Sequence, residues 1–429
     1  MKLALLMLAL ATAAAQELAP ETVLVARIKD HLRTQFEQLP DYTCLESVVR
    51  YHRQPGRGMK LRPLDHLQLE VLYSGGEEWF GWPGARTLEY KDPARFIGGG
   101  MIGNGIFALF ERDLLMPATI FQYGGEEAGP GGRAEVRYAY RVPRLLSPQL
   151  ITLAGVRGTV GVRGTLWADR VSLDLVRLEV EAWDIPEYLP LAEMSARMDF
   201  THTRIGAGDV LLAQNADLHM RELAGEENYD RFEFTHCSQF HAQSSVRFEA
   251  DSSAEAQSPP ANRGENAEET ADEKVPALLL VTIALTTPIA EGDAVGKPIE
   301  GRTVGNVLRK GKIAIPSGSL VHGRLRRLEQ SDIKPGYFIV GLEYTEIEIG
   351  GAPVMFYADL IKMDHRGGIL PALESHIVQP RYPGITQEAL ETITLPEIPG
   401  VASFFVPGKT LSLPAGLQTT WRTRGLLNH

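Results

Sequence analysis

The chain has 429 residues, of which 44% are hydrophobic and 23% are charged, so it is long enough for two globular domains. Its formal net charge is −11, and the segment from Asp251 to Lys274 alone carries seven acids against two bases. The rest is only mildly acidic and no broad basic surface is indicated, which argues against a nucleic-acid-binding protein.

The first fifteen residues, MKLALLMLALATAAA, combine one lysine, an apolar run and small residues at Ala13 and Ala15. This pattern predicts a signal peptide over residues 1–15. No cysteine stands at the cleavage site, and no later stretch reaches the roughly 18 apolar residues of a membrane helix. We therefore expect a periplasmic or secreted protein without a transmembrane segment after signal removal.

After the signal peptide, the sequence predicts one helix and then a long run of strands. Thr22 to Leu39 carries apolar residues at steps of three and four, and Pro40 ends the helix. From Tyr42 to Phe248 the period becomes two, as in Leu67, Leu69, Val71 and Tyr73. Gly and Pro separate most runs, which is typical of an antiparallel meander with one buried face. The first domain is expected to span residues 16–250.

An acidic segment, residues 251–274, has no aromatic residue and is predicted to be a disordered linker. Short strands follow over residues 275–365, where a small β-barrel or sandwich is expected. Residues 366–429 are Pro-rich and predicted to supply one closing strand. The fold class is therefore mainly β, with two domains that we expect to fold separately, so that cleavage of the linker leaves two stable fragments.

The chain has two cysteines, Cys44 and Cys237. In an exported chain an even number favours one disulfide. A metal site formed by Cys237 with His236 and His241 is the alternative, but this spacing matches no closed zinc pattern. No metal and no cofactor are predicted.

The stretch FIGGGMIGNGIFALF, Phe96 to Phe110, is rich in glycine. It lacks the G-x-G-x-x-G spacing after a buried strand and the Lys-Ser or Lys-Thr pair that nucleotide sites need. A short apolar helix is expected to follow it across the sheet, either as a fixed plug or as a movable flap over a pocket. With the aromatic cluster of EEWFGWPG, it provides the predicted ligand-binding residues: Trp79, Trp82, Phe107, Phe110 and Leu114.

The sequence contains no G-x-S-x-G or H-E-x-x-H motif. The acid pairs Glu77–Glu78 and Glu126–Glu127 are interpreted as solvated charge at turns. The basic cluster of RLRRLE, with Arg324 and Arg326 on one face and Arg327 on the other, could meet an acidic partner or the linker. A catalytic residue is not predicted, and the chain is interpreted as more compatible with a non-enzymatic protein than with an enzyme.

Three resemblances follow from these segments. GTLWADRVSLDLVRLEV, with Trp167, Asp169 and the strand Leu175 to Val180, resembles the half-barrel of periplasmic lipoprotein carriers (LolA-like) and related anti-sigma-factor regulators. LPDYTCLESV, GGEEWFGWPG and GGGMIGNGIFAL resemble a group of uncharacterised exported bacterial proteins. GKIAIPSGSLVHGRL, with Ile315, Pro316 and Gly318, is similar to the small β-barrel of conjugation and type IV secretion scaffold proteins.

The first resemblance implies a curved sheet with helices on its concave side, holding an acyl chain or a lipidated protein. The resemblance to the secretion scaffold proteins implies a barrel, residues 275–365, that docks on an envelope protein. The expected function is therefore that of a non-enzymatic exported envelope protein that binds an apolar ligand or an envelope partner. The alternatives are a hydrolase acting on envelope lipid or glycan, and a purely structural interaction protein.

Overall fold

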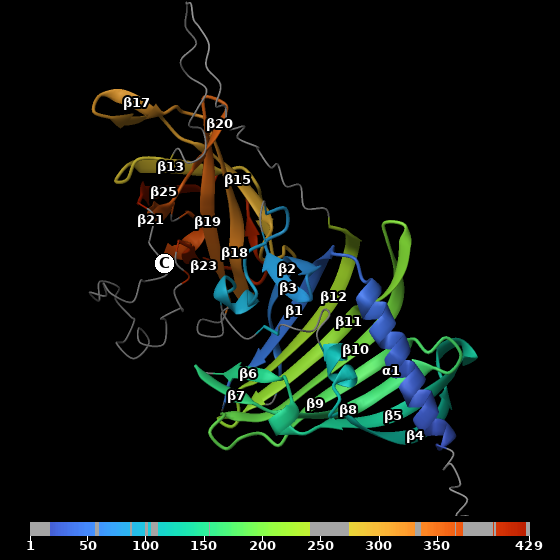
Figure 1. Ribbon diagram of the computed structural model, residues 1–429. Helices are drawn as coiled ribbons and strands as arrows, with labels where there is room; N and C mark the ends of the chain where they lie inside the picture. The colour runs from blue at the N-terminus through green and yellow to red at the C-terminus, as the bar shows by residue number, and fades with distance from the viewer. Residues whose placement is uncertain are drawn as a thin grey trace, which may run out of the picture.

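A computed structural model describes residues 18–55, 60–85, 88–98, 102–103, 110–153, 155–240, 274–330, 336–364, 366–371, 398 and 400–425. The predicted signal peptide and almost all of the predicted linker lie outside these residues. These residues form two large antiparallel sheets and one long helix (Figure 1). This confirms a mainly-β fold with a curved half-barrel sheet.

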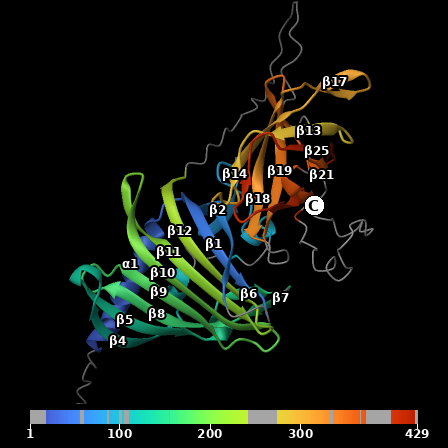
Figure 2. The same cartoon turned by 180° about the vertical axis from the view of Figure 1, so that it is seen from behind.

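Helix α1 (Pro20–Gln38) begins two residues before its predicted start, with proline in its first turn. It buries Leu24, Ile28 and Leu32. The helix lies diagonally across one face of the first sheet, and the view from behind places it beyond the strands (Figures 1 and 2). The hydroxyl of Tyr138 donates to the carbonyl of Glu21 over 2.7 Å and holds the first turn of α1 against the sheet.

The first sheet has ten strands in the order β3-β2-β1-β12-β11-β10-β9-β8-β5-β4, and each pair is antiparallel. The strands are β1 (Tyr42–Arg53), β2 (Arg62–Ser74), β3 (Glu77–Gly81), β4 (Ile120–Ala128), β5 (Ala134–Val142), β8 (Gly161–Asp169), β9 (Leu175–Trp183), β10 (Leu191–Ile205), β11 (Gly208–Glu222) and β12 (Glu227–Gln239). A separate hairpin pairs β6 (Leu150–Leu153) with β7 (Val156–Thr159). Short 3-10 turns are η1 (Pro93–Arg95), η2 (Phe110–Leu115), η3 (Pro130–Gly132) and η4 (Arg144–Leu146).

The two faces of this sheet differ in chemistry. Alternate residues such as Tyr138, Leu178 and Phe232 are buried on the inner face. The outer face carries ion pairs between neighbouring strands, including Arg177 with Asp199 at 2.8 Å. Because one face is apolar and the other charged, a one-residue slip of any strand would bury charge, so the pattern fixes the register.

Cys44 on β1 and Cys237 on β12 form a disulfide, with Cα atoms 4.1 Å apart. The register shifts here, because Thr43 pairs with Ser238 while Leu45 pairs with Thr235. Cys44 therefore faces two residues of β12, which is a β-bulge. The predicted disulfide is confirmed, and it links the first strand of the meander to the last.

The second large sheet has the order β21-β25-β13-β15-β18-β19-β23-β22, with β20 also paired to β19. Its strands are β13 (Leu280–Leu285), β15 (Pro298–Thr303), β18 (Leu320–Gln330), β19 (Tyr337–Ile349), β20 (Ala352–Met355), β21 (Ala358–Met363), β22 (Leu370–Pro371), β23 (Ala402–Pro407) and β25 (Gln418–Thr423). Two small sheets pair β14 (Ile289–Ala290) with β24 (Ser412–Leu413) and β16 (Val307–Arg309) with β17 (Lys312–Ile315); η5 is Arg366–Gly368. The C-terminal segment thus supplies several strands rather than the single one predicted.

The two sheets with their loops form two units, which contact each other through hydrogen bonds of main-chain and side-chain groups. Val295 of the second unit pairs with β2 of the first. Its N–H donates to the carbonyl of His66 over 2.7 Å, and its carbonyl accepts from the N–H of Gln68 over 2.9 Å. On β18, Arg326 donates to the carbonyl of Phe96 over 2.7 Å, and its guanidinium lies 4.9 Å from the ring centre of Trp82. The units are therefore docked, a contact that the sequence did not indicate.

Gly296 makes this close approach possible. Its φ is +100°, and a Cβ added there would lie 2.5 Å from the carbonyl oxygen of Gln68 and 2.8 Å from the Trp82 ring. A larger residue would therefore push the units apart.

We expect the two units to stay together after the chain between them is cut. With a specific protease site inserted between residues 255 and 265, the cleaved fragments should co-elute on gel filtration, because the contact of Val295 with β2 remains. Gly296→Ala should weaken their association about tenfold or more through steric overlap. Gly416→Ala is the matched control: its φ is +95° but no atom lies within 4 Å of the added Cβ. Separate elution of the unsubstituted fragments would contradict the prediction.

Candidate functional site

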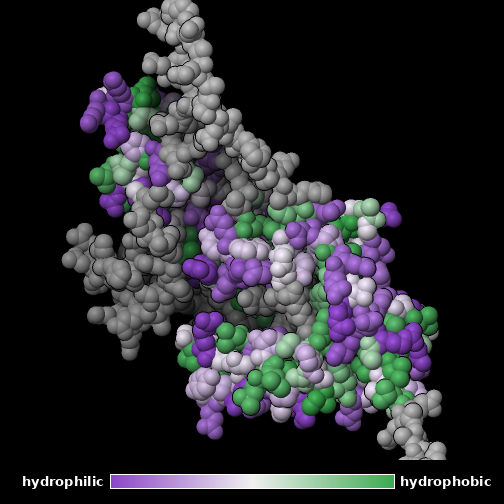
Figure 3. All heavy atoms as spheres, in the orientation of Figure 1, coloured by the Kyte–Doolittle hydropathy of each residue, from purple (hydrophilic) through white to green (hydrophobic). Residues whose placement is uncertain are grey.

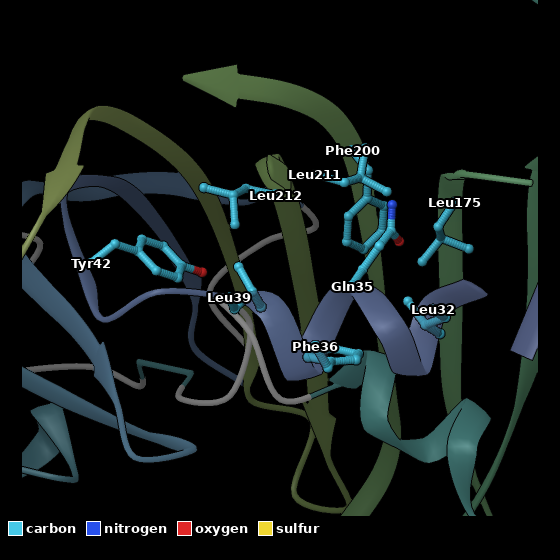
Figure 4. Close-up of a pocket in the computed structure, with 9 residues that line it drawn as sticks. All are labelled: Leu32, Gln35, Phe36, Leu39, Tyr42, Leu175, Phe200, Leu211 and Leu212. Atoms are coloured by element: carbon cyan, nitrogen blue, oxygen red, sulfur yellow. The ribbon is translucent and has the colours of Figure 1, made fainter. Parts of the chain in front are cut away.

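An apolar pocket lies between the C-terminal half of α1 and the inner face of the first sheet (Figure 4). Its cavity volume is about 20 Å³, and the wider hollow of about 340 Å³ around it includes open solvent, so the pocket is open rather than a closed cavity. Its lining comes from α1 and the residue that follows it, from β9, β10 and β11, and from the start of β1: Leu32, Gln35, Phe36, Leu39, Tyr42, Leu175, Phe200, Leu211 and Leu212. Seven of these nine side chains are aliphatic or phenylalanine, so the pocket suits an apolar group.

The pocket has a buried floor and a partly exposed rim. Tyr42, Leu175 and Leu212 are almost completely buried. Phe36 and Phe200 are only partly buried and pack against that core. Partly exposed aromatic side chains around an apolar floor leave hydrophobic surface for a ligand to cover.

Asp174, in the turn between β8 and β9, holds α1 over the pocket. It accepts hydrogen bonds of 2.8 Å from both His31 and Gln35 of the helix. Burial alone would raise the pKa of Asp174, but hydrogen bonds from His31, Ser172 and His202 outweigh burial and lower it to about 2. The carboxylate is therefore charged, and it fixes the amide of Gln35 at the pocket wall.

The predicted ligand-binding residues lie elsewhere. Trp82 packs edge-on against Phe96, with ring centres 5.0 Å apart, beside the second unit. The amine of Lys91 lies 4.7 Å from the ring centre of Trp79 on β3. Leu114 in η2 is buried in the core. Phe107 lies outside the described residues, and for Phe110 only the backbone, at the start of η2, is described. The pocket lining includes none of the three described side chains, so their role in ligand binding stays a prediction.

A second feature of the inner face is a buried ion pair on β1 and β2. The guanidinium of Arg50 donates to both carboxylate oxygens of Asp65, over 2.8 and 2.7 Å, and to the carbonyl of Gly98 over 3.1 Å. The side chains of Arg50 and Asp65 are 1% and 2% exposed. Such a bidentate pair neutralises one carboxylate, here that of Asp65, and leaves no second positive charge for another buried carboxylate.

Two further carboxyls are buried near this pair. Asp230 of β12 lies opposite Arg50 and is 1% exposed. Glu46 is 2% exposed and lies four residues before Arg50 on the same face of β1. Among the described residues, both oxygens of Asp230 and the Oε2 atom of Glu46 are buried without a hydrogen-bond partner. These carboxyls lack the contacts that normally stabilise a buried charge.

Their environment favours the protonated forms. Burial raises the pKa of Asp230 to about 8; Arg50 opposes this shift and the charge of Asp65 adds to it. Burial, and then the charges of Glu78 and Asp230, raise the pKa of Glu46 well above its usual range. At neutral pH the carboxyl of Asp230 is therefore protonated.

The structure corrects two interpretations made from sequence. Glu78, expected to be solvated at a turn, lies on β3 and is 4% exposed, because its strand places it on the buried face opposite Tyr73. Arg326 and Arg327, expected on opposite faces, are both buried because a β-bulge interrupts β18 between Leu325 and Arg327. Their charges meet Glu343 and Glu329 of the same chain.

The proposed metal ligands do not assemble among the described residues. Cys237 is bonded to Cys44, and His241 lies outside them. In the part of the chain that the structure describes, no group of three or more His, Cys, Asp or Glu side chains is arranged to hold a metal ion. No helix of these residues is long and apolar enough to cross a membrane.

No family model matches the sequence, and no curated protein matches it. The crystal structure of a DUF1329 family protein from Desulfovibrio piger is similar to this chain at 13% identity, covering 53% of this chain and 97% of that one, with a TM-score of 0.26.

Proposed function

We propose that this chain is a non-enzymatic exported envelope protein that binds an apolar ligand, an acyl chain or a lipidated protein, on the inner face of its half-barrel. The observation that carries the proposal is the pocket between α1 and strands β9 to β11, because its floor and rim are apolar. Gln35 and Tyr42 are the polar members of the lining, placed to orient a ligand's polar end.

The arrangement of the titratable groups favours binding over hydrolysis. A hydrolase would bring groups with shifted pKa values together in a cleft that a substrate can enter. Glu46 and Asp230 have such shifts, but they are buried and neither belongs to the pocket lining. The described residues that line the pocket include no carboxyl group, histidine, serine or cysteine.

Binding of a fluorescent fatty acid should therefore depend on the pocket. Leu211→Asp should weaken binding of the probe by about tenfold or more, because a ligand would bury a carboxylate without a partner. Leu39→Trp should weaken it as well, by filling the space without adding charge. Fluorescence titration of the purified protein measures both effects.

Leu150→Asp serves as the matched control, since Leu150 is a strand residue that is 50% exposed and outside the pocket. It should leave the affinity unchanged. Equal loss in Leu150→Asp, or unchanged affinity in both pocket variants with their fold intact, would contradict the proposal. Mass spectrometry of lipids extracted from protein purified from its native compartment would then identify the natural ligand.

A further inference from the structure

The hairpin of β16 and β17 projects from the second unit, away from the half-barrel (Figures 1 and 2). Its turn, Lys310 and Gly311, has φ values of +50° and +79°, which is the backbone of a tight two-residue hairpin turn. At its base Val307 and Ile315 are buried, and Ser317 donates its N–H to the side chain of Asn306 over 2.8 Å. The hairpin is thus anchored at one end and presents the other to solvent.

The tip of the hairpin is positively charged. Residues 301–328 contain seven Lys and Arg and no Asp or Glu, in a chain whose net charge is −11. Arg309 and Lys312 lie directly opposite each other on the two strands, and Lys310 stands between them. All three are exposed, and no acidic partner is seen for them among the described residues. Opposed like charges destabilise a hairpin, so this arrangement favours an anionic partner.

The same tip exposes apolar side chains. Leu308 and Ile313 form the neighbouring cross-strand pair, and they are 59% and 58% exposed. Cross-strand partners point to the same face, and successive residues alternate, so the leucine–isoleucine pair and the Arg309–Lys312 pair lie on opposite faces. Figure 3 shows hydrophilic side chains at this end of the molecule, with hydrophobic ones beside them.

We propose that the β16–β17 hairpin docks this protein on an anionic lipid bilayer. The cations of the hairpin are attracted to an anionic membrane surface, and the apolar side chains beside them enter the interfacial region of the bilayer. A bilayer fits this hairpin better than an acidic protein does, because a projecting tip of a few residues is too small for a standard protein interface. This inference does not rest on the pocket or on its ligand.

The test is co-sedimentation of the chain from Gln16 with vesicles of phosphatidylcholine, with and without 30% phosphatidylglycerol. The wild type should bind the anionic vesicles and release them in high salt. Arg309→Gln/Lys310→Gln/Lys312→Gln should lower the partition coefficient by about 100-fold, since each cation near the surface contributes about fivefold. Leu308→Ser/Ile313→Ser should lower it by about tenfold while keeping all charges.

The matched control is Lys362→Gln/Lys409→Gln/Arg422→Gln, which removes three exposed cations elsewhere on the same unit. It should bind like the wild type. An equal loss in the control would show general charge attraction and overturn the proposal. Failure of the wild type to bind anionic vesicles would overturn it too, as would hairpin-dependent binding to an acidic protein without any vesicle binding. Unchanged thermal unfolding of the variants excludes misfolding as the cause.

Discussion

The variant Cys44→Ala/Cys237→Ala is expected to lose up to about 5 kcal/mol of unfolding free energy relative to the oxidised wild type. The disulfide closes a loop with a sequence separation of 193, so it removes a large part of the chain entropy of the unfolded state. It also joins β1 and β12, the two strands that are farthest apart in the sequence of the first sheet and pair directly.

Urea unfolding under oxidising conditions measures this difference. Reductant should bring the wild type to the stability of the variant and leave the variant itself unchanged. Labelling of oxidised, denatured wild type should detect no free thiol. Two reactive thiols, or a difference in unfolding free energy below about 1 kcal/mol, would be incompatible with this role of the bond.

Local patterns in the sequence predicted the strands and the helix well. The alternation in Leu67, Leu69 and Val71 indicated β2 and its buried face, and these three side chains are fully buried in the structure. The stripe on α1 indicated Ile28 and Leu32 as buried residues. Such features depend on side-chain spacing within one element, which is why they can be read without tertiary information.

The pocket could be predicted only in part. Leu32, Phe36 and Leu39 belong to the predicted helical stripe, but Phe200, Leu211 and Leu212 come from the ends of β10 and β11. The register of these two strands shifts between Asp199 and Phe200, so strict alternation fails there. Which strand ends lie beside the helix depends on the order of ten strands, and no local pattern encodes that order.

The burial of Glu46 and Arg50 could have been predicted from the sequence, but it was missed in the sequence analysis. Glu46 and Arg50 follow Tyr42 and Cys44 at even spacing and therefore share the buried face of β1. The docking of the two units left no such signal, because it rests on Val295 and Gly296 meeting β2 and Trp82, which are far away in the sequence.

The free energy of unfolding should fall as the pH rises from about 4 to about 8. In the unfolded chain Asp and Glu side chains ionise near pH 4. In the folded protein Asp230 keeps its proton until about pH 8, and burial likewise raises the pKa of Asp113 to about 6, against a hydrogen bond from Gln149. Between these values the folded state binds more protons, so raising the pH favours unfolding by up to about 1.4 kcal/mol per pH unit for each such proton.

Asp230→Asn should flatten this pH dependence and make the protein more stable than the wild type at pH 7 to 8. The amide has nearly the same shape as the protonated carboxyl but has no proton to lose, and Arg50 keeps its bidentate bond to Asp65. The matched control is Asp217→Asn on the outer face of β11, where the carboxylate meets Arg231 in contact with solvent. Urea unfolding at four pH values from 4 to 8 measures the slopes. A wild-type curve that rises over this range, or equal slopes for the wild type and Asp230→Asn, would show that Asp230 is already ionised in the folded protein, with the charge of Arg50 sufficient for both aspartates.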